Sequence, residues 1–346
     1  MIDELHKFIF EGQPVRGMLV RLGPSWRESL RRREAQAAYP APVRALLGEM
    51  AAAAVLMQAN IKFNGALVLQ VFGDGPVKLA VAEVQPDLGF RATAKVVGAV
   101  PSDAKLAAML NVHGKGRCAI TLDPQDKSGG AQPYQGVVGL HGDAGEPLQV
   151  LAQVLEHYML QSEQLDTRLL LAATDQCAAG LLIQRLPVEG EGNLERRRAA
   201  AGPSQGEATS PPGGGEPKAT GGRHFREDEI GINEAFNRIA LLTATLTREE
   251  LLSLDAETLL RRLYWEEDVR RFTPLRPQFS CRCSRERVRG MLRGLGAAEV
   301  EGIVAELGKV EVGCEFCGLQ YGFDSVDVGE LFTAQRDQPP GSASLQ

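Results

Sequence analysis

The sequence predicts an α+β protein with an N-terminal mixed sheet-and-helix domain, a helical linker and a small C-terminal domain built around four cysteines. Three observations indicate this architecture. Helix-like and strand-like segments follow one another irregularly over the first 185 residues, a segment rich in Gly and Pro then interrupts the chain, and four of the six cysteines fall within residues 281–317. Helices and strands that are not in strict alternation are typical of the α+β class.

The length and composition fit several domains and a protein without a strong overall charge. The 346 residues exceed the usual size of one domain, which is about 100 to 200 residues. A formal net charge of −6 argues against binding of the whole chain to nucleic acid or to a lipid surface. Met1–Phe10 lacks the basic start of a signal peptide, and the longest apolar stretch, Ala51–Met57, is too short to span a membrane. We therefore expect a cytoplasmic protein that does not contact a membrane.

The N-terminal domain is predicted to span residues 1–186. Helical composition predicts helices at 25–33 and 42–58, and apolar residues at helical spacing predict another at 146–161. Strands at 66–72 and 77–84 flank the turn-forming Gly73-Asp74-Gly75-Pro76, which predicts a hairpin. A second hairpin is expected from 117–122 and 134–140, and buried strands from 167–173 and 179–185.

The chain changes character between this domain and the cysteines. Residues 187–226 contain nine Gly and five Pro and few large apolar side chains, so we expect a flexible insert there. Residues 227–275 form a predicted helical linker, in which Thr247 and Glu250 make a capping box and Asp255 caps the next helix. The linker has few core residues of its own, and we expect it to pack against a neighbouring domain.

The cysteines form two closely spaced pairs. Cys281-Arg282-Cys283 is followed, after 30 intervening residues, by Cys314-Glu315-Phe316-Cys317. Two such pairs match a tetrahedral four-thiolate zinc site. We therefore predict a zinc-binding domain at residues 276–330 that holds one ion through Cys281, Cys283, Cys314 and Cys317, followed by a tail at 331–346. The domain has too few apolar residues to fold alone, so metal binding and folding should be one event.

Local signals place the cysteines between short elements. Ser284 can cap a helix that runs to about Arg293, and a second helix at 297–307 should end at Gly308. Strands at 309–312 and 319–323 then surround the second cysteine pair. The expected result is a knuckle-like turn that presents Cys314 and Cys317.

The chemistry of the site leaves two interpretations open. Thiolates are the oxidisable form of cysteine, so an oxidant could convert such a cluster, expel its zinc and unfold the domain. Four-cysteine sites more often have a purely structural role, as in a zinc ribbon that only closes the end of a domain. The C-x-C spacing favours the redox interpretation slightly, because each pair can form a disulfide without the other.

Other functional classes receive less support. Residues 276–330 hold seven Lys or Arg against nine Asp or Glu, which is poor for phosphate contact, although several arginines cluster near Cys283. A structural zinc ribbon that binds nucleic acid remains the alternative. A thiol-disulfide oxidoreductase would place its C-x-x-C pair at a helix start, whereas short strands flank Cys314 and Cys317. The sequence contains no recognisable motif that pairs a nucleophile with a general base, so we do not expect an enzyme.

Several stretches resemble the redox-regulated 33-kilodalton heat-shock chaperonin family of bacterial holdases, and they extend over nearly the full chain. They are Tyr264–Pro274 (YWEEDVRRFTP), Phe279–Arg287 (FSCRCSRER), Gly308–Val328 with its CEFC motif, and the shorter Gly114-Lys115-Gly116, Tyr134-Gln135-Gly136, Gly142-Asp143 and Ser162-Glu163-Gln164-Leu165. The segment 187–226 departs from the family, since it is longer than expected at that junction.

The resemblance implies a mechanism. In the family the reduced, zinc-bound protein is inactive, and oxidation pairs neighbouring cysteines, here Cys281 with Cys283 and Cys314 with Cys317, and releases the zinc. The zinc domain and the linker then lose structure, and the protein dimerises and holds unfolding client proteins without ATP. The resemblance thus implies a client-binding core at residues 1–186 and a redox-sensitive linker at 227–275.

Overall fold

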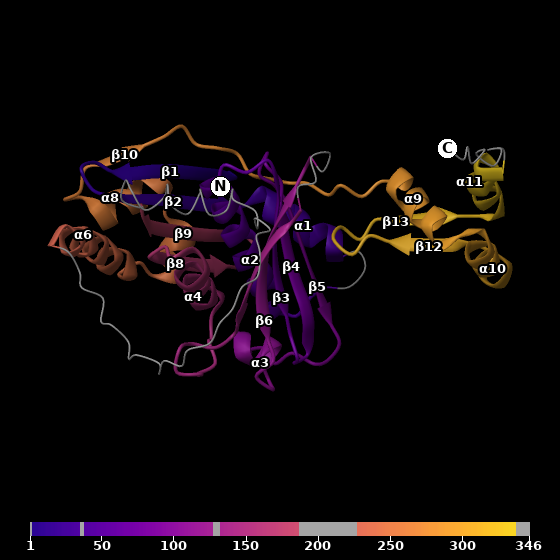
Figure 1. The fold of residues 1–346 in the computed structure, drawn as a ribbon, viewed down its shortest axis with the longest axis horizontal. Coiled ribbons are helices and arrows are strands. Elements are labelled where there is room, and N and C mark those ends of the chain that lie inside the picture. Colours follow the sequence, from indigo (N-terminus) through magenta and orange to yellow (C-terminus); the bar gives the residue numbers. More distant parts are fainter. Residues whose placement is uncertain (1, 35–37, 127–131, 187–226, 337–346) are drawn as a thin grey trace, which may run out of the picture.

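The computed structural model describes residues 2–34, 38–126, 132–186 and 227–336 and has the predicted α+β architecture (Figure 1). Two large sheets form the centre of the molecule, the helical linker lies at one end, and the four-cysteine module lies at the other. The insert predicted at 187–226 lies outside the described residues. No helix in the described part of the chain has both the length and the apolar character needed to cross a bilayer.

The first sheet, here sheet A, has five antiparallel strands in the order β10-β1-β2-β9-β8. Its strands are β1 (Glu4–Phe10), β2 (Val15–Leu22), β8 (Thr167–Ala173), β9 (Ala178–Arg185) and β10 (Val269–Arg271). The structure confirms the two strands predicted from their apolar runs, β8 and β9. Strand β10 comes from the end of the linker, so the C-terminal half of the chain completes a sheet made by the N-terminal domain.

The second sheet, sheet B, has six strands in the order β11-β5-β4-β3-β6-β7. They are β3 (Gly65–Phe72), β4 (Val77–Val84), β5 (Gly89–Val96), β6 (Arg117–Pro124), β7 (Tyr134–Gly139) and β11 (Gln278–Phe279). Both predicted hairpins, β3 with β4 and β6 with β7, are confirmed as antiparallel pairs. The short β11 pairs in parallel with β5.

Helix α2 (Ala41–Asn60) packs against both sheets and forms the centre of the main core. Its residues Ala51–Ala54 are fully buried, and these small side chains let the sheets approach the helix closely. A helix that is apolar on nearly every side must be surrounded by protein. Helices α1 (Pro24–Glu34), α3 (Leu106–Leu110) and α4 (Leu151–Glu163) complete the domain. Helix α4 begins later than the predicted residue 146 because Leu148 donates its backbone N–H to Leu140 instead.

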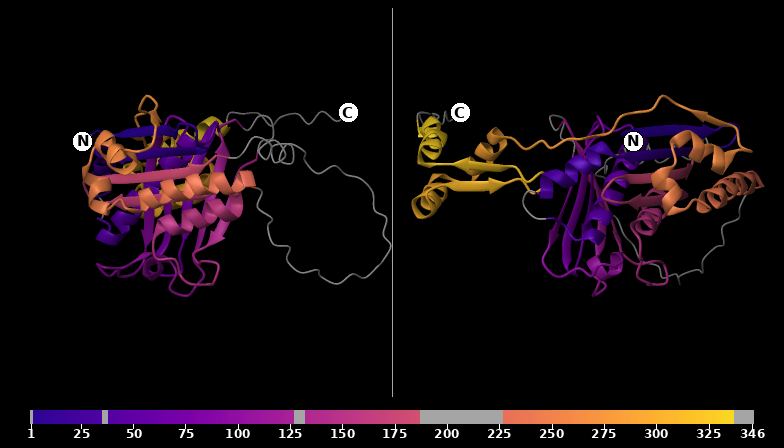
Figure 2. Two further views of the ribbon diagram at one scale, coloured as in Figure 1. Left: turned by 90° about the vertical axis from the view of Figure 1, so that its left-hand side faces the viewer. Right: turned by 180° about the vertical axis from the view of Figure 1, so that it is seen from behind.

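The linker helices cover the face of sheet A that points away from α2 (Figure 2). They are α6 (Glu227–Ala244), α7 (Arg248–Ser253) and α8 (Ala256–Tyr264). The capping box of Thr247 with Glu250 and the Asp255 cap are both present as predicted. Apolar residues of all three helices form one buried cluster with Phe8, Phe10 and their neighbours on the sheet. The expectation that the linker packs on a neighbouring domain is therefore confirmed.

The cysteine module has its own small core. It contains α9 (Arg285–Leu295), α10 (Ala297–Leu307), β12 (Val310–Gly313), β13 (Gln320–Phe323) and α11 (Ser325–Arg336). Ser284 caps α9 and Gly308 ends α10 with a positive φ of 79°, as predicted. Helix α11 crosses the predicted start of the tail at residue 331, and Leu331 and Phe332 are buried in the module core. Asp324 starts this helix by accepting the backbone N–H groups of Val326 and Asp327.

Candidate metal centre

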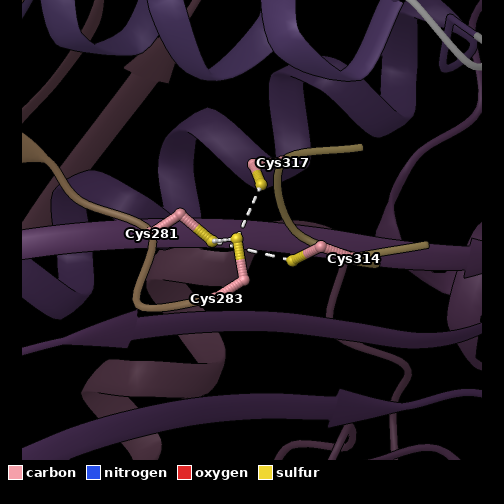
Figure 3. A group of neighbouring side chains, drawn as sticks. All are labelled: Cys281, Cys283, Cys314 and Cys317. Carbon is pink, nitrogen blue, oxygen red and sulfur yellow. Dashed lines mark hydrogen bonds between the residues drawn. The ribbon is translucent and has the colours of Figure 1, made fainter. Parts of the chain in front are cut away.

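Two loops bring the four cysteines together (Figure 3). Cys281 and Cys283 lie between β11 and α9, whereas Cys314 and Cys317 lie in the turn between β12 and β13. In that turn Gly318 has a positive φ of 73° and donates its N–H to the carbonyl of Cys314 at 2.8 Å. The turn therefore aims both sulfurs of the second pair at the first pair, as the knuckle prediction required.

The sulfur positions fit a tetrahedral metal ion. Cys281 Sγ lies 3.5 Å from Cys283 Sγ and 3.6 Å from Cys314 Sγ, and Cys283 Sγ lies 3.3 Å from Cys317 Sγ. All four sulfurs are within 4.8 Å of one another. Zinc–sulfur bonds of about 2.3 Å in tetrahedral geometry require sulfur–sulfur distances of roughly 3.8 Å. The four cysteines could thus hold one metal ion with little movement.

The thiols share protons unequally. A hydrogen bond from Cys314 lowers the pKa of Cys281, and the same contact together with burial raises the pKa of Cys314 to about 12. Burial raises the pKa of Cys317. Cys281 is consequently the first of these three sulfurs to become a thiolate, the form that attacks oxidants and binds metals.

Access to solvent differs among the ligands. Cys281, Cys283 and Cys314 are partly exposed, whereas Cys317 is buried at 4% exposure. The hydroxyl of Tyr321 on β13 hydrogen-bonds Cys283, which raises the pKa of that tyrosine. The remaining cysteines, Cys118 and Cys177, are buried in the core domain, and burial raises the pKa of Cys118 to about 12. An oxidant in water therefore meets the clustered cysteines first.

The core domain also contacts the cluster. Arg91 on β5 lies over the ring of Phe316 at 4.0 Å and interacts with Cys281. Burial lowers the pKa of Arg91, but its pairs with Glu83 and Cys281 outweigh that effect and raise it. The sequence analysis did not identify Arg91, because this arginine lies far from the cysteines along the chain and forms no recognisable motif with them.

The arginines of α9 are engaged within the module. Arg285 pairs with Asp327 at 2.7 Å, and Arg293 pairs with Glu286 at 3.4 Å. Arg285 also stacks on Phe323 at 4.3 Å. Two carboxylates, Asp327 and Glu286, thus offset part of the basic cluster that the sequence displays near Cys283.

Comparison with known proteins defines the class of the chain. The family model described as Hsp33 protein matches residues 3–324. Proteins named 33 kDa chaperonin from Chromobacterium violaceum and Neisseria meningitidis are 43% and 38% identical to the chain, each over 95% of it and over 94% and 91% of their own lengths. The crystal structure of the Thermotoga maritima 33 kDa chaperonin, at 19% identity, has the same fold with a TM-score of 0.66, covering 97% of this chain and 99% of its own.

The fold and the family match are thus those of a chaperone. The chain belongs to the Hsp33 family. The family resemblance found in the sequence is confirmed over nearly its whole length.

Proposed function

We propose that this chain is a redox-regulated, ATP-independent holdase of the cytoplasm, inactive when reduced and zinc-bound. The observation that carries the proposal is the apolar contact between the linker and sheet A. Tyr264 of α8 is 2% exposed, and its ring lies 5.0 Å from that of Phe10 and 6.2 Å from that of Phe8. Release of the linker would uncover a continuous apolar surface, which is what unfolding client proteins bind.

In the reduced state the four cysteines are the proposed ligands. Zinc bound to such a site contributes about 10–16 kcal/mol of folding free energy in zinc-finger peptides. The module core of Leu292, Val300, Phe323 and a few neighbours is small. The ligated thiolates therefore hold the two loops of the module together, and through them the module stays folded.

Oxidation removes the ligands. With hydrogen peroxide as oxidant, two thiolates lose one electron each and form a disulfide, while the peroxide takes up those two electrons and two protons and leaves as two waters. We assign the disulfides to Cys281 with Cys283 and to Cys314 with Cys317, on family resemblance. The sulfur distances are compatible with this pairing and with pairing across the loops. A disulfide offers no thiolate, so the oxidised cysteines can no longer retain the ion.

Unfolding of the module then affects the linker because the two are consecutive along the chain. Helix α8 continues into β10, β11 and Cys281, so the module is attached to the C-terminal end of the linker. Polar contacts also join the linker to the core: Arg21 donates to the carbonyl of Leu252, Arg248 donates to that of Ala173 and pairs with Glu49, and β10 pairs with β1. Once released, the linker exposes the face of sheet A, which holds clients and supports a homodimer of oxidised chains.

The test is aggregation of a chemically unfolded protein, followed by light scattering. We expect reduced, zinc-loaded chain to leave aggregation unchanged, and peroxide-treated chain to suppress it while a zinc-sensitive dye reports release. A Cys283→Ser variant should lose the oxidative switch, whereas Cys118→Ala, which alters a buried cysteine outside the cluster, should keep it.

The alternative, a structural zinc ribbon, gives a different result. In that case peroxide would leave the zinc bound, or would release it without any suppression of aggregation. Binding of a labelled oligonucleotide that weakens with salt would support the nucleic-acid version of this alternative.

A further inference from the structure

Strand β5 of the core domain touches both loops that carry the cysteines. Phe90, Ala92 and Ala94 of β5 belong to the main core. Because side chains alternate along a strand, Arg91 and Thr93 project from the opposite face. Thr93 is nevertheless only 9% exposed, and the side chain of Arg91 only 18%. The cysteine loops cover this part of the sheet, where the module meets the core in Figure 1.

The first loop is joined to β5 through its backbone. Gln278 and Phe279 form β11, which pairs in parallel with Gly89 and Phe90. Ser280, the residue before Cys281, donates its N–H to the carbonyl of Phe90 at 2.9 Å. The ring of Phe279 also packs edge-on against Phe90, with centroids 6.5 Å apart. The chain is therefore fixed on the sheet up to the residue that precedes the first ligand.

The second loop is joined to the same strand through side chains. The hydroxyl of Thr93 donates to the carbonyl of Glu315 at 2.6 Å, and Arg33 donates to the same carbonyl at 3.5 Å. The guanidinium of Arg91 covers the ring of Phe316 at 4.0 Å. Glu83 holds that guanidinium in place through bonds of 2.6 and 3.1 Å. Glu315 and Phe316 are the two residues between Cys314 and Cys317.

From this arrangement we infer that β5 positions both cysteine pairs, with Arg91 and Thr93 as positioning residues, so that retention of the metal depends on the core domain. The inference rests on the zinc site proposed above. Two ligand pairs separated by 30 residues are brought together before the ion binds, which reduces the entropy lost on binding. A divalent ion with four thiolates carries a net charge of about −2, which the nearby Arg91 complements.

The coupling also acts in reverse. If docking on β5 strengthens metal binding, metal binding must strengthen docking by the same factor, because the two equilibria are linked. Release of the metal consequently loosens the module from the core domain as well as unfolding it. Arg91 and Thr93 thereby set how readily the switch opens.

The experiment measures the rate at which full-length, reduced protein gives up zinc to excess 4-(2-pyridylazo)resorcinol. Thr93→Val removes one hydroxyl donor and keeps the shape of the side chain, and we expect release about five-fold faster. Arg91→Ala removes the cation over Phe316 and should accelerate release about ten-fold or more. Lys95→Ala is the matched control, since Lys95 is an exposed basic residue on the same face of β5, and its release should stay within about two-fold of the unaltered protein.

Two further measurements separate positioning from a general loss of structure. Arg91→Ala and Phe316→Leu should be non-additive in a double-mutant cycle on the release rate, because they remove the same contact. Thermal unfolding of the core, followed by the fluorescence of buried Trp26, should change little in Thr93→Val, because Tyr39, which also contacts the Thr93 hydroxyl, keeps its hydrogen bonds to the backbone of Ala94. This variant remains decisive if Arg91→Ala, which leaves Glu83 without its partner, fails to fold.

Unchanged zinc release in Thr93→Val, or additive effects of Arg91→Ala and Phe316→Leu, would overturn the inference and leave the zinc switch standing. Equal acceleration by Lys95→Ala would also overturn it, because general charge would then explain the effect. Reduced, unaltered protein that contains no zinc would overturn both the inference and the proposed function.

Discussion

The carboxylate of Glu49, in the middle of core helix α2, lies 3.5 Å from the guanidinium of Arg248 at the start of linker helix α7. The side chain of Glu49 is 18% exposed. Burial raises its pKa from 4.5 to about 7, although Arg248 opposes that shift. This ion pair joins the linker to the core at a group that titrates close to neutral pH.

The first prediction concerns pH. Because the folded-state pKa of Glu49 is raised, the stability it contributes is fully present below about pH 4.5 and is lost as pH rises through about 7. The full shift corresponds to about 3 kcal/mol at most. We expect Glu49→Gln to remove this pH dependence, measured as the difference in urea unfolding free energy between variant and parent at pH 5 and pH 8. A difference that is the same at both values would contradict the assignment.

The second prediction concerns the linker. Leu259 of α8 is fully buried against sheet A, and truncation of such a side chain costs about 2–5 kcal/mol. Leu259→Ala should therefore loosen the linker and give the reduced protein measurable holding activity and increased binding of a hydrophobic dye. Leu241→Ala, at a position 71% exposed on α6, is the control and should behave like the parent. Equal dye binding by both variants would argue against the linker as the element that covers the apolar face of sheet A.

The third prediction concerns removal of the metal under reducing conditions. A strong chelator should unfold the module, so the amides of β12 and β13 lose their protection from hydrogen exchange. The amides of β3, β4 and β6 should stay protected, because the main core of the protein does not include the module. Protection of β12 and β13 that survives chelation would mean that the module folds without metal.

The fourth prediction concerns the disulfides. After peroxide treatment, peptide mass spectrometry should find Cys281 linked to Cys283 and Cys314 linked to Cys317, with Cys118 and Cys177 still reduced. Buried thiols with raised pKa values react slowly, so Cys118 and Cys177 should stay reduced. A bond between Cys283 and Cys317, whose sulfurs lie 3.3 Å apart, is the outcome that would contradict the assigned pairing.

Local signals made much of the fold predictable. The caps at Thr247, Asp255 and Ser284 and the helix end at Gly308 were predicted correctly, because each depends on residues within one turn of helix. The cysteine cluster was predictable for a similar reason, since its two pairs have spacings that few other sites share. The domain boundaries stay predictions.

Long-range pairing was not predictable from the chain. Phe8 pairs with Arg271 across sheet A, and Phe90 pairs with Phe279 across sheet B. Such pairs depend on register between distant segments, and the three-residue β10 and two-residue β11 are too short to show a strand pattern. The contact between Arg91 and Phe316 was missed for the same reason, as it exists only once the module docks.

The order of elements along the chain has a consequence for biosynthesis. Strands β1, β2, β8 and β9 are complete when residue 185 has been made, but α6, α7 and α8, which cover them, extend to residue 264. At about 5–20 residues per second, a ribosome needs roughly 4–16 s to make the cover after the sheet is finished. During that interval each nascent chain presents the apolar face of sheet A without protection. Before its linker is complete, every newly made copy therefore exposes the same apolar face that the proposed function assigns to client binding.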